Sequence, residues 1–161
     1  MNQQNRSMDA APEIRIRKAR ESDLPELIRL YEQLHLGDYS YRPPSLREMR
    51  TAFRAIARDR AHHLLVATLD SHVVGTLHVL IFRHLGHGLH PVAIVENVVV
   101  LDTMRSQRIG EQLIDEAARI AERNRCYKLS LTTNLKRRHA HRFYERLGWS
   151  KTHFGYSFSL D

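Results

Sequence analysis

One segment, residues 96–113, constrains the fold most, because an apolar run passes through a short polar turn into an amphipathic helix. The β-branched residues around Val98 are typical of a strand, and the apolar spacing after Ile109 is typical of a helix that packs on one face. A helix start leaves several backbone N–H groups without partners and carries partial positive charge. The turn therefore predicts a binding site for an anion such as phosphate, and Arg105 and Arg108 add positive charge to it.

Length and composition favour one domain with its own core, since the chain has 161 residues of which 42% are hydrophobic. No apolar run reaches the roughly 18 residues that a membrane span needs, so we expect a soluble protein without a membrane partner. The single cysteine, Cys126, excludes an internal disulfide, and the chain opens without a secretion leader. Both features predict a cytoplasmic location. Residues 1–12 are polar and aperiodic, which predicts a mobile tail before a domain at residues 13–161.

Hydrophobic periodicity predicts the element order β-α-α-β-β-β-α-β-α-β. The near-continuous apolarity of the fourth predicted strand is typical of a central strand covered on both faces, and Asp70-Ser71 suits a tight hairpin turn. The predicted strands are Glu13–Lys18, His63–Leu69, His72–Phe82, Val92–Leu101, Cys126–Thr132 and Phe154–Leu160.

Capping residues delimit the predicted helices. Ser22 or Asp23 would cap the first helix, which Gly37 would end before a loop. Ser45 and Glu48 have the spacing of a capping box for the second helix. The remaining two helices are predicted over Ile109–Arg123 and Arg138–Leu147, with Gly148 as the stop.

The net charge of +7 would suit a polyanionic partner. The arginines are nevertheless dispersed over positions that we interpret as solvated faces, and Lys136-Arg137-Arg138 forms the one dense cluster. A small anionic cofactor or substrate would use this charge equally well. A basic nucleic-acid-binding module, in which the turn and this cluster contact phosphates, is an alternative that salt-sensitive binding would reveal. No recognised nucleic-acid motif supports it, so we expect no nucleic-acid partner.

The element order and two segments, Glu96–Leu113 and Thr132–Trp149, resemble the GCN5-related N-acetyltransferases (GNAT), which transfer acetyl from acetyl-CoA to an amine. The resemblance covers residues 13–160. It implies a single α/β domain with a mixed, mostly antiparallel, twisted sheet flanked by helices. The second segment and Thr152-His153-Phe154 are similar to the aminoalkylphosphonate N-acetyltransferase branch of this family.

The family's pyrophosphate motif is Arg or Gln, two residues, Gly, one residue, then Gly or Ala. Arg105 and Gly110 match it, but Arg108 stands in the place of the first glycine. Because a left-handed backbone would cost arginine about 1–2 kcal/mol, we expect Arg108 at negative φ. The resemblance implies that the strand pairs with the pantetheine arm, the turn amides hold the pyrophosphate, and Asn134 bonds a pantetheine amide. The cofactor-binding residues would be Val98, Val99, Val100, Arg105, Ser106, Gln107, Arg108, Ile109, Gly110, Glu111, Asn134 and Tyr144.

Glu96 is the candidate general base. A carboxylate within an apolar strand faces a wet cleft or is partly desolvated, which would raise its pKa toward a useful range. Strand alternation places residues 96 and 97 on opposite faces, so we expect one of Glu96 and Asn97 to face the substrate. The alternative is a structural strand residue paired with a basic neighbour.

The resemblance implies that the Tyr144 hydroxyl is the acid that protonates the departing CoA thiolate. A core aromatic residue is the alternative for Tyr144, and we interpret Phe143 in that way. A simple strand-end cap is the alternative for Asn134.

His84, His87 and His90 recur in a loop before the Glu96 strand. We expect no metal there, because the glycines and Pro91 disrupt helical spacing and no acidic or cysteine ligand is near in sequence. We instead expect His84, His87 and Arg83 to line the acceptor pocket and donate to an anionic substrate.

The resulting hypothesis is acetylation of the primary amine of a small molecule, including an aminoalkylphosphonate, by direct attack in a ternary complex. The alternative within the same fold is a peptide or protein terminus. Acceptor pockets in this family are built from early helices and variable loops, here residues 31–44 and 82–91. The aromatic residues of the last predicted strand also imply, by resemblance, a homodimer.

Overall fold

The computed structural model describes residues 13–34, 42–158 and 160. The predictions for residues 1–12 and for a helix end at Gly37 lie outside this part of the chain. The strands are β1 (Arg15–Lys18), β2 (His62–Leu69), β3 (His72–Phe82), β4 (Val92–Val100) and β5 (Lys128–Leu131). The helices are α1 (Leu24–Leu34), α2 (Leu46–Arg58), α3 (Ile109–Arg123) and α4 (Arg138–Arg146). Short 3-10 turns occupy Glu21–Asp23, His87–Leu89 and Asp102–Met104.

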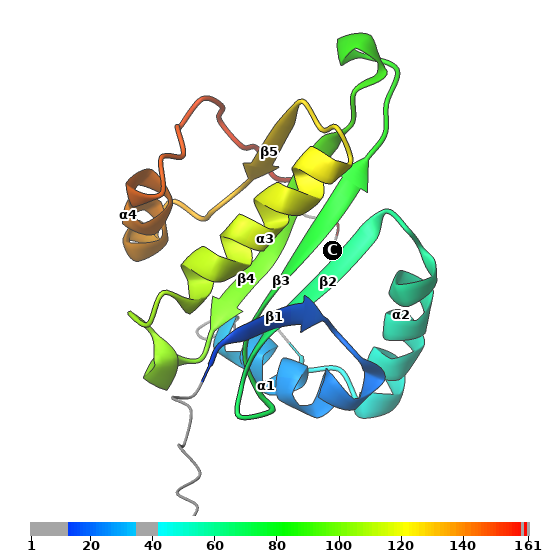
Figure 1. Ribbon diagram of the computed structural model, residues 1–161, viewed down its shortest axis with the longest axis vertical. Coiled ribbons are helices and arrows are strands. Elements are labelled where there is room, and N and C mark those ends of the chain that lie inside the picture. The colour runs from blue at the N-terminus through cyan, green and yellow to red at the C-terminus, as the bar shows by residue number, and fades with distance from the viewer. Residues whose placement is uncertain (1–12, 35–41, 159, 161) are drawn as a thin grey trace, which may run out of the picture.

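The strands form one five-stranded sheet in the order β1-β2-β3-β4-β5 (Figure 1). The first three pairings are antiparallel and β4–β5 is parallel, which confirms the mixed, mostly antiparallel sheet. The predicted hairpin is also confirmed, because Asp70 (φ 47°) and Ser71 (φ 70°) both adopt the left-handed backbone of a type I′ turn.

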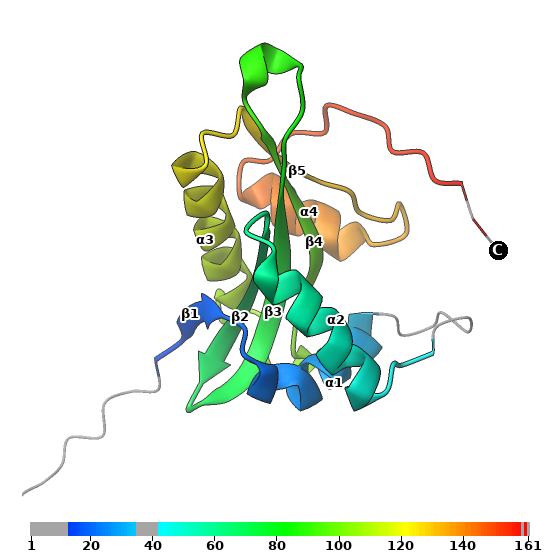
Figure 2. The ribbon, with the colours of Figure 1, turned by 90° about the vertical axis from the view of Figure 1, so that its right-hand side faces the viewer.

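Helices cover the sheet on both faces (Figure 2). On one face α3 packs through Leu113 and Ala117 against residues such as Leu77. On the other face α1 packs through Leu27 and Leu30 against a second buried cluster. The strand β4 contributes to both clusters, which confirms the prediction of a central strand covered on both sides.

The two N-terminal helices are capped differently. The capping box of α2 is confirmed, since the Ser45 N–H donates to the Glu48 carboxylate at 2.8 Å and the Ser45 hydroxyl accepts from the Glu48 N–H. At the start of α1, Asp23 belongs to the capping box of the preceding 3-10 turn instead of acting as the simple N-cap that was predicted, since its buried carboxylate accepts from the Arg20 N–H at 2.7 Å and from both Nη atoms of Arg17. Asp23 thus links the start of α1 to β1.

The predicted last strand is wrong. Residues 151–158 form no helix or strand, and Figure 2 shows this segment running away from the sheet. The side chains of Phe154, Tyr156 and Phe158 are 92%, 95% and 88% exposed. Alternation of aromatic residues predicts which side chains share a face, but a strand also needs a neighbour for its backbone hydrogen bonds. This segment has none within the described part of the chain.

Candidate active site

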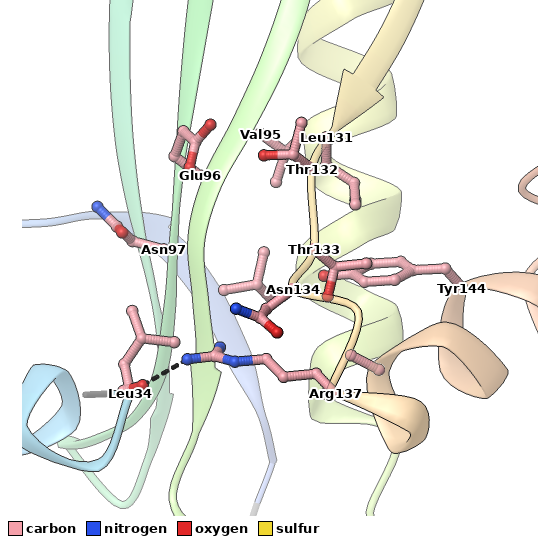
Figure 3. A pocket seen from close by; sticks show the side chains of 12 residues that line it. Leu34, Val95, Glu96, Asn97, Leu131, Thr132, Thr133, Asn134, Arg137 and Tyr144 are labelled. Carbon is pink, nitrogen blue, oxygen red and sulfur yellow. Dashed lines mark hydrogen bonds between the residues drawn. The ribbon is translucent and has the colours of Figure 1, made fainter. Parts of the chain in front are cut away.

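A cleft opens where β4 and β5 separate (Figure 3). The parallel pairing ends at Val95 and Leu131, and beyond this point β4 diverges from the segment that leads to α4. The cleft has a volume of about 250 Å³. One wall is formed by β4 and the other by the β5–α4 connection and α4. The residues that matter for its chemistry are Glu96, Asn97, Thr133, Asn134, Arg137 and Tyr144.

A bulge in β4 brings both Glu96 and Asn97 to this cleft, which corrects the expectation that only one of them faces it. Asn97 has φ 55°, and the register with β3 shifts between Thr76–Val99 and His78–Glu96. Two residues of β4 therefore oppose one residue of β3, and the alternation of faces breaks at this point. Both side chains are exposed and line the cleft.

Glu96 and Tyr144 approach the cleft from opposite walls (Figure 3). The Glu96 carboxylate is exposed and lines the cleft, which agrees with the first of the two alternatives, a carboxylate that faces a wet cleft. The Tyr144 ring, in contrast, is largely buried. Burial raises the pKa of Tyr144 to about 12, Arg137 opposes this shift, and the negative charge of Glu96 adds to it. The Tyr144 hydroxyl therefore remains protonated at neutral pH and can act as an acid.

Aromatic contacts hold Tyr144 in place. Its ring centroid lies 5.1 Å from that of Phe143 and 5.6 Å from that of Trp149. Phe143 is half-buried against α3, where a Cβ on Gly110 would approach the Phe143 ring to 3.2 Å. Gly110 thus allows α4 to pack closely on the first turn of α3, and this contact ties the wall that carries Tyr144 to the predicted phosphate turn.

The turn before α3 presents unpaired backbone donors. Arg105 N–H donates to Asp102 and Gln112 N–H to Arg108, but within the described residues no protein acceptor faces the N–H groups of residues 106–111. Ser106 has φ 65° and Arg108 φ 60°. Successive unpaired amides at a helix start are suited to bind an anion, so the geometry is compatible with the phosphate site that the sequence predicts, which stays a prediction.

The prediction of a negative φ at Arg108 is wrong. Arg108 is left-handed at the N-cap of α3, as the glycine of the family motif would allow, and its guanidinium forms an ion pair with Glu111 (Nε–Oε2 3.0 Å). Arg105 is likewise paired, with Asp102. The backbone geometry of the motif is therefore kept at a cost of about 1–2 kcal/mol, while both arginine charges are locally balanced.

Asn134 ends the segment after β5 and lines the cleft. Its Oδ1 accepts the Lys136 N–H at 2.9 Å and its carbonyl accepts the Arg137 N–H at 2.9 Å. Asn134 therefore has the capping role that was the alternative for it. Because Asn134 also lines the cleft, its contact with a pantetheine amide stays a prediction.

Arg137 is a cleft residue that the sequence did not single out, since its cluster suggested only nucleic-acid phosphates. Its Nη2 donates to the Leu34 carbonyl at 2.6 Å, across the cleft from α4 to α1 (Figure 3). The signal available in the sequence was its position three residues after Asn134, at the start of the helix that carries Tyr144.

The histidine loop lies elsewhere, beyond the ends of β3 and β4 (Figure 1). The His87 ring stacks on Tyr127 with centroids 4.2 Å apart, and His84 lies 5.9 Å from Phe82. Arg83, His84 and His87 are not among the residues that line the cleft, so the geometry does not support their expected role. No group of three or more metal-ligating side chains occurs within the described ranges.

The acetyltransferase (GNAT) family matches residues 22–149, a span that includes the β4 bulge, the phosphate turn and Tyr144. The chain belongs to this family. It is therefore an N-acetyltransferase, and its cosubstrate is acetyl-CoA.

Individual proteins match over almost the whole chain. The aminoalkylphosphonate N-acetyltransferase of Salmonella typhimurium is 32% identical over 155 residues, which are 96% of this chain and 97% of the relative. The structure of a transcriptional regulator from Bacillus halodurans has a TM-score of 0.85 at 31% identity and covers 92% of this chain and 100% of its own. A putative acetyltransferase from Agrobacterium tumefaciens has a TM-score of 0.83 at 29% identity, with 91% and 99% covered.

Within the described ranges, no helix combines the length and the apolar character that a membrane span requires.

Proposed function

We propose that this protein transfers acetyl from acetyl-CoA to the primary amine of a small molecule, by direct attack in a ternary complex. The observation that carries this proposal is the placement of an exposed carboxylate, Glu96, and a protonated hydroxyl, Tyr144, on opposite walls of one cleft. A base for the incoming amine and an acid for the departing sulfur are the two proton-transfer groups that the reaction uses.

The free edge of β4 and the unpaired turn amides fit acetyl-CoA. Beyond Val95 the described residues pair no strand with β4 on the side of the cleft, so the backbone of Val98–Val100 is open to the amide groups of a pantetheine arm. The amides of residues 106–111 would hold the pyrophosphate. Asn134 and Tyr144 would contact the cofactor at its thioester end, which supplies an already activated acyl group.

Each residue then has a defined task. Glu96 would accept a proton from the acceptor ammonium, directly or through one water, and so supply a neutral amine. As the amine nitrogen bonds to the thioester carbon and the C–S bond breaks, Tyr144 would donate its proton to the sulfur. The proton that the new amide nitrogen loses would then restore the tyrosine hydroxyl through solvent. Alignment of the amine and the thioester would contribute more, since favourable positioning is worth about 7–11 kcal/mol.

A small acceptor fits the space that the described residues enclose, about 250 Å³. The relative from Salmonella typhimurium carries the name of an enzyme that acetylates aminoalkylphosphonates, which makes these compounds the first acceptors to test. A peptide terminus would instead require an open groove along the cleft.

Free thiol release with a panel of amines tests this proposal. The panel contains an aminoalkylphosphonate, an amino sugar, a polyamine and a short peptide, each with saturating acetyl-CoA. We expect turnover with one of the small amines and an acetylated amine by mass spectrometry. Turnover with the peptide alone would assign the alternative acceptor. Calorimetry with coenzyme A is the control, and no binding there would refute the proposal as a whole.

We further propose that the C-terminal segment forms a homodimer. Four alternating apolar residues, Phe154, Tyr156, Phe158 and Leu160, are 88–95% exposed, and among the described strands β5 is the last in the sheet, with no strand paired on its outer edge. A second copy offers the backbone partner that this segment lacks, and burial of aromatic side chains stabilises such contacts. Sedimentation of the wild type and of a Phe154→Asp, Phe158→Asp variant tests this, with a dimer and a monomer expected. A monomeric wild type would contradict it.

A further inference from the structure

Arg137 carries a positive charge in the cleft and has no acidic partner among the described residues. It precedes α4 and lines the cleft. Its Nη2 donates to the Leu34 carbonyl oxygen at the end of α1. Figure 3 shows the guanidinium lying across the cleft toward α1. Since α1 and α3 cover opposite faces of the sheet, this guanidinium points to the face away from the phosphate turn, which opens α3.

The arginines of the turn before α3 have acidic partners, whereas the arginine of the cleft has none among the described residues. Arg105 and Arg108 at the turn have carboxylate partners in Asp102 and Glu111. Arg137 has no carboxylate within ion-pair distance among the described residues, and its one hydrogen bond goes to a neutral carbonyl. A guanidinium has five N–H donors in a planar fork, so most of its capacity to bind an oxyanion remains available.

We infer that Arg137 binds an anionic group on the acceptor, so that the enzyme selects amines that also carry a phosphonate, phosphate or carboxylate. This inference rests on the proposed function, because it assigns a specificity residue to the same cleft. Glu96 on β4 faces the ammonium end of the acceptor, and Arg137 on the opposite wall faces its oxyanion. An acceptor with one charge of each sign is complementary to this pair.

The histidine loop had been the sequence-based candidate for this role, but its rings contact Tyr127 and Phe82 instead of the cleft. Arg137 provides the hydrogen-bond donors for an anionic substrate that the histidine loop was expected to provide. Arginine is also the better residue for it, because its fork matches the oxygens of a phosphonate or carboxylate in a bidentate contact. Removal of a charged hydrogen bond of this kind lowers kcat/KM by roughly 10- to 100-fold.

The test compares 2-aminoethylphosphonate with propylamine, a neutral amine of similar length. The variants are Arg137→Gln, which keeps an N–H donor for Leu34 O, and Arg137→Lys, which keeps the charge without the fork. Arg138→Gln is the matched control, because it removes the same charge from the next residue, which is exposed and does not line the cleft.

For Arg137→Gln we expect the KM for aminoethylphosphonate to rise about 10- to 100-fold, with propylamine kinetics and the Kd for coenzyme A within about threefold of wild type. Arg137→Lys should recover part of the loss, and Arg138→Gln should behave as wild type. Equal losses for both amines, or weaker coenzyme A binding, would overturn the inference. A wild type that acetylates propylamine as well as aminoethylphosphonate would overturn it too, while leaving the proposed function intact. A wild type that acetylates no amine would instead refute the proposed function.

Discussion

Val95 and Val99 lie four residues apart on β4 but are buried in different core clusters, Val95 under α3 and Val99 under α1. In a regular strand, residues separated by four positions share a face. The bulge at Asn97 adds one residue between them and so reverses the faces. The same irregularity turns the Glu96–Asn97 pair toward the cleft, which links the packing of the core to the placement of the candidate base.

Asn97 is therefore expected to tolerate glycine but not valine. Asn is one of the few non-glycine residues that adopt a left-handed backbone readily, whereas a β-branched residue at φ 55° is strained. Asn97→Val should lower the free energy of unfolding by about 1–2 kcal/mol relative to Asn97→Gly. Urea denaturation of both variants measures this difference. Equal stability of the two would show that the left-handed conformation is not required.

Arg108 provides a second test of backbone strain. Arg108→Ala and Arg108→Gly both remove the ion pair with Glu111, which is exposed on the arginine side and is lost equally in the two variants. Only the glycine variant also relieves the left-handed strain. We expect Arg108→Gly to be about 1 kcal/mol more stable than Arg108→Ala, as measured by denaturant unfolding. An alanine variant at least as stable as the glycine variant would contradict this geometry.

Tyr144→Phe tests the candidate acid. The ring and its contacts with Phe143 and Trp149 are kept, so the fold should be unaffected near neutral pH. Loss of the proton donor should lower kcat by about 100-fold or more, with little change in the Kd for coenzyme A. Steady-state kinetics and calorimetry separate these quantities. Unchanged kcat would assign the protonation of sulfur to another group.

The same variant tests the raised pKa of Tyr144. The unfolded tyrosine ionises near pH 10 and the folded one at about 12, so between these values the unfolded state binds fewer protons and the free energy of unfolding falls with pH. Two pKa units correspond to about 2.7 kcal/mol. Tyr144→Phe should lose less stability than the wild type between pH 10 and 12. Parallel losses in both proteins would show that the hydroxyl is not desolvated.

The sequence predicted the parts of this molecule that depend on local patterns. The hairpin at Asp70-Ser71, the capping box at Ser45 and the strand, turn and helix of residues 96–113 each rest on residues close in the chain. The bulge at Asn97 was not predicted, because a run of valines does not show where alternation breaks. The position of Arg137 in the cleft was not predicted either, because its contact with Leu34 joins residues that are 103 positions apart. The prediction of a last strand was wrong because a strand depends on a neighbouring strand as much as on its own residues.

A half-buried pair of histidines beside the cleft strand predicts a loss of stability in acid. His78 lies on β3 opposite Glu96, and its Nε2 is 2.9 Å from His62 Nδ1. Burial, with smaller contributions from His62 and His63, lowers the pKa of His78 from 6.5 to about 4. Between these values the unfolded state binds the additional proton. The free energy of unfolding therefore rises with pH, and this contribution is lost as the pH falls from 6.5 toward 4.

Burial also lowers the pKa of His63, so both His63 and His78 contribute to this pH dependence. Because the His78 ring is only partly buried, solvent screening reduces the effect, and His78→Gln should flatten this dependence by about 1–2 kcal/mol, as measured by urea unfolding at pH 4.5 and 7. His72→Gln, an exposed position on the same strand, should leave most of it in place.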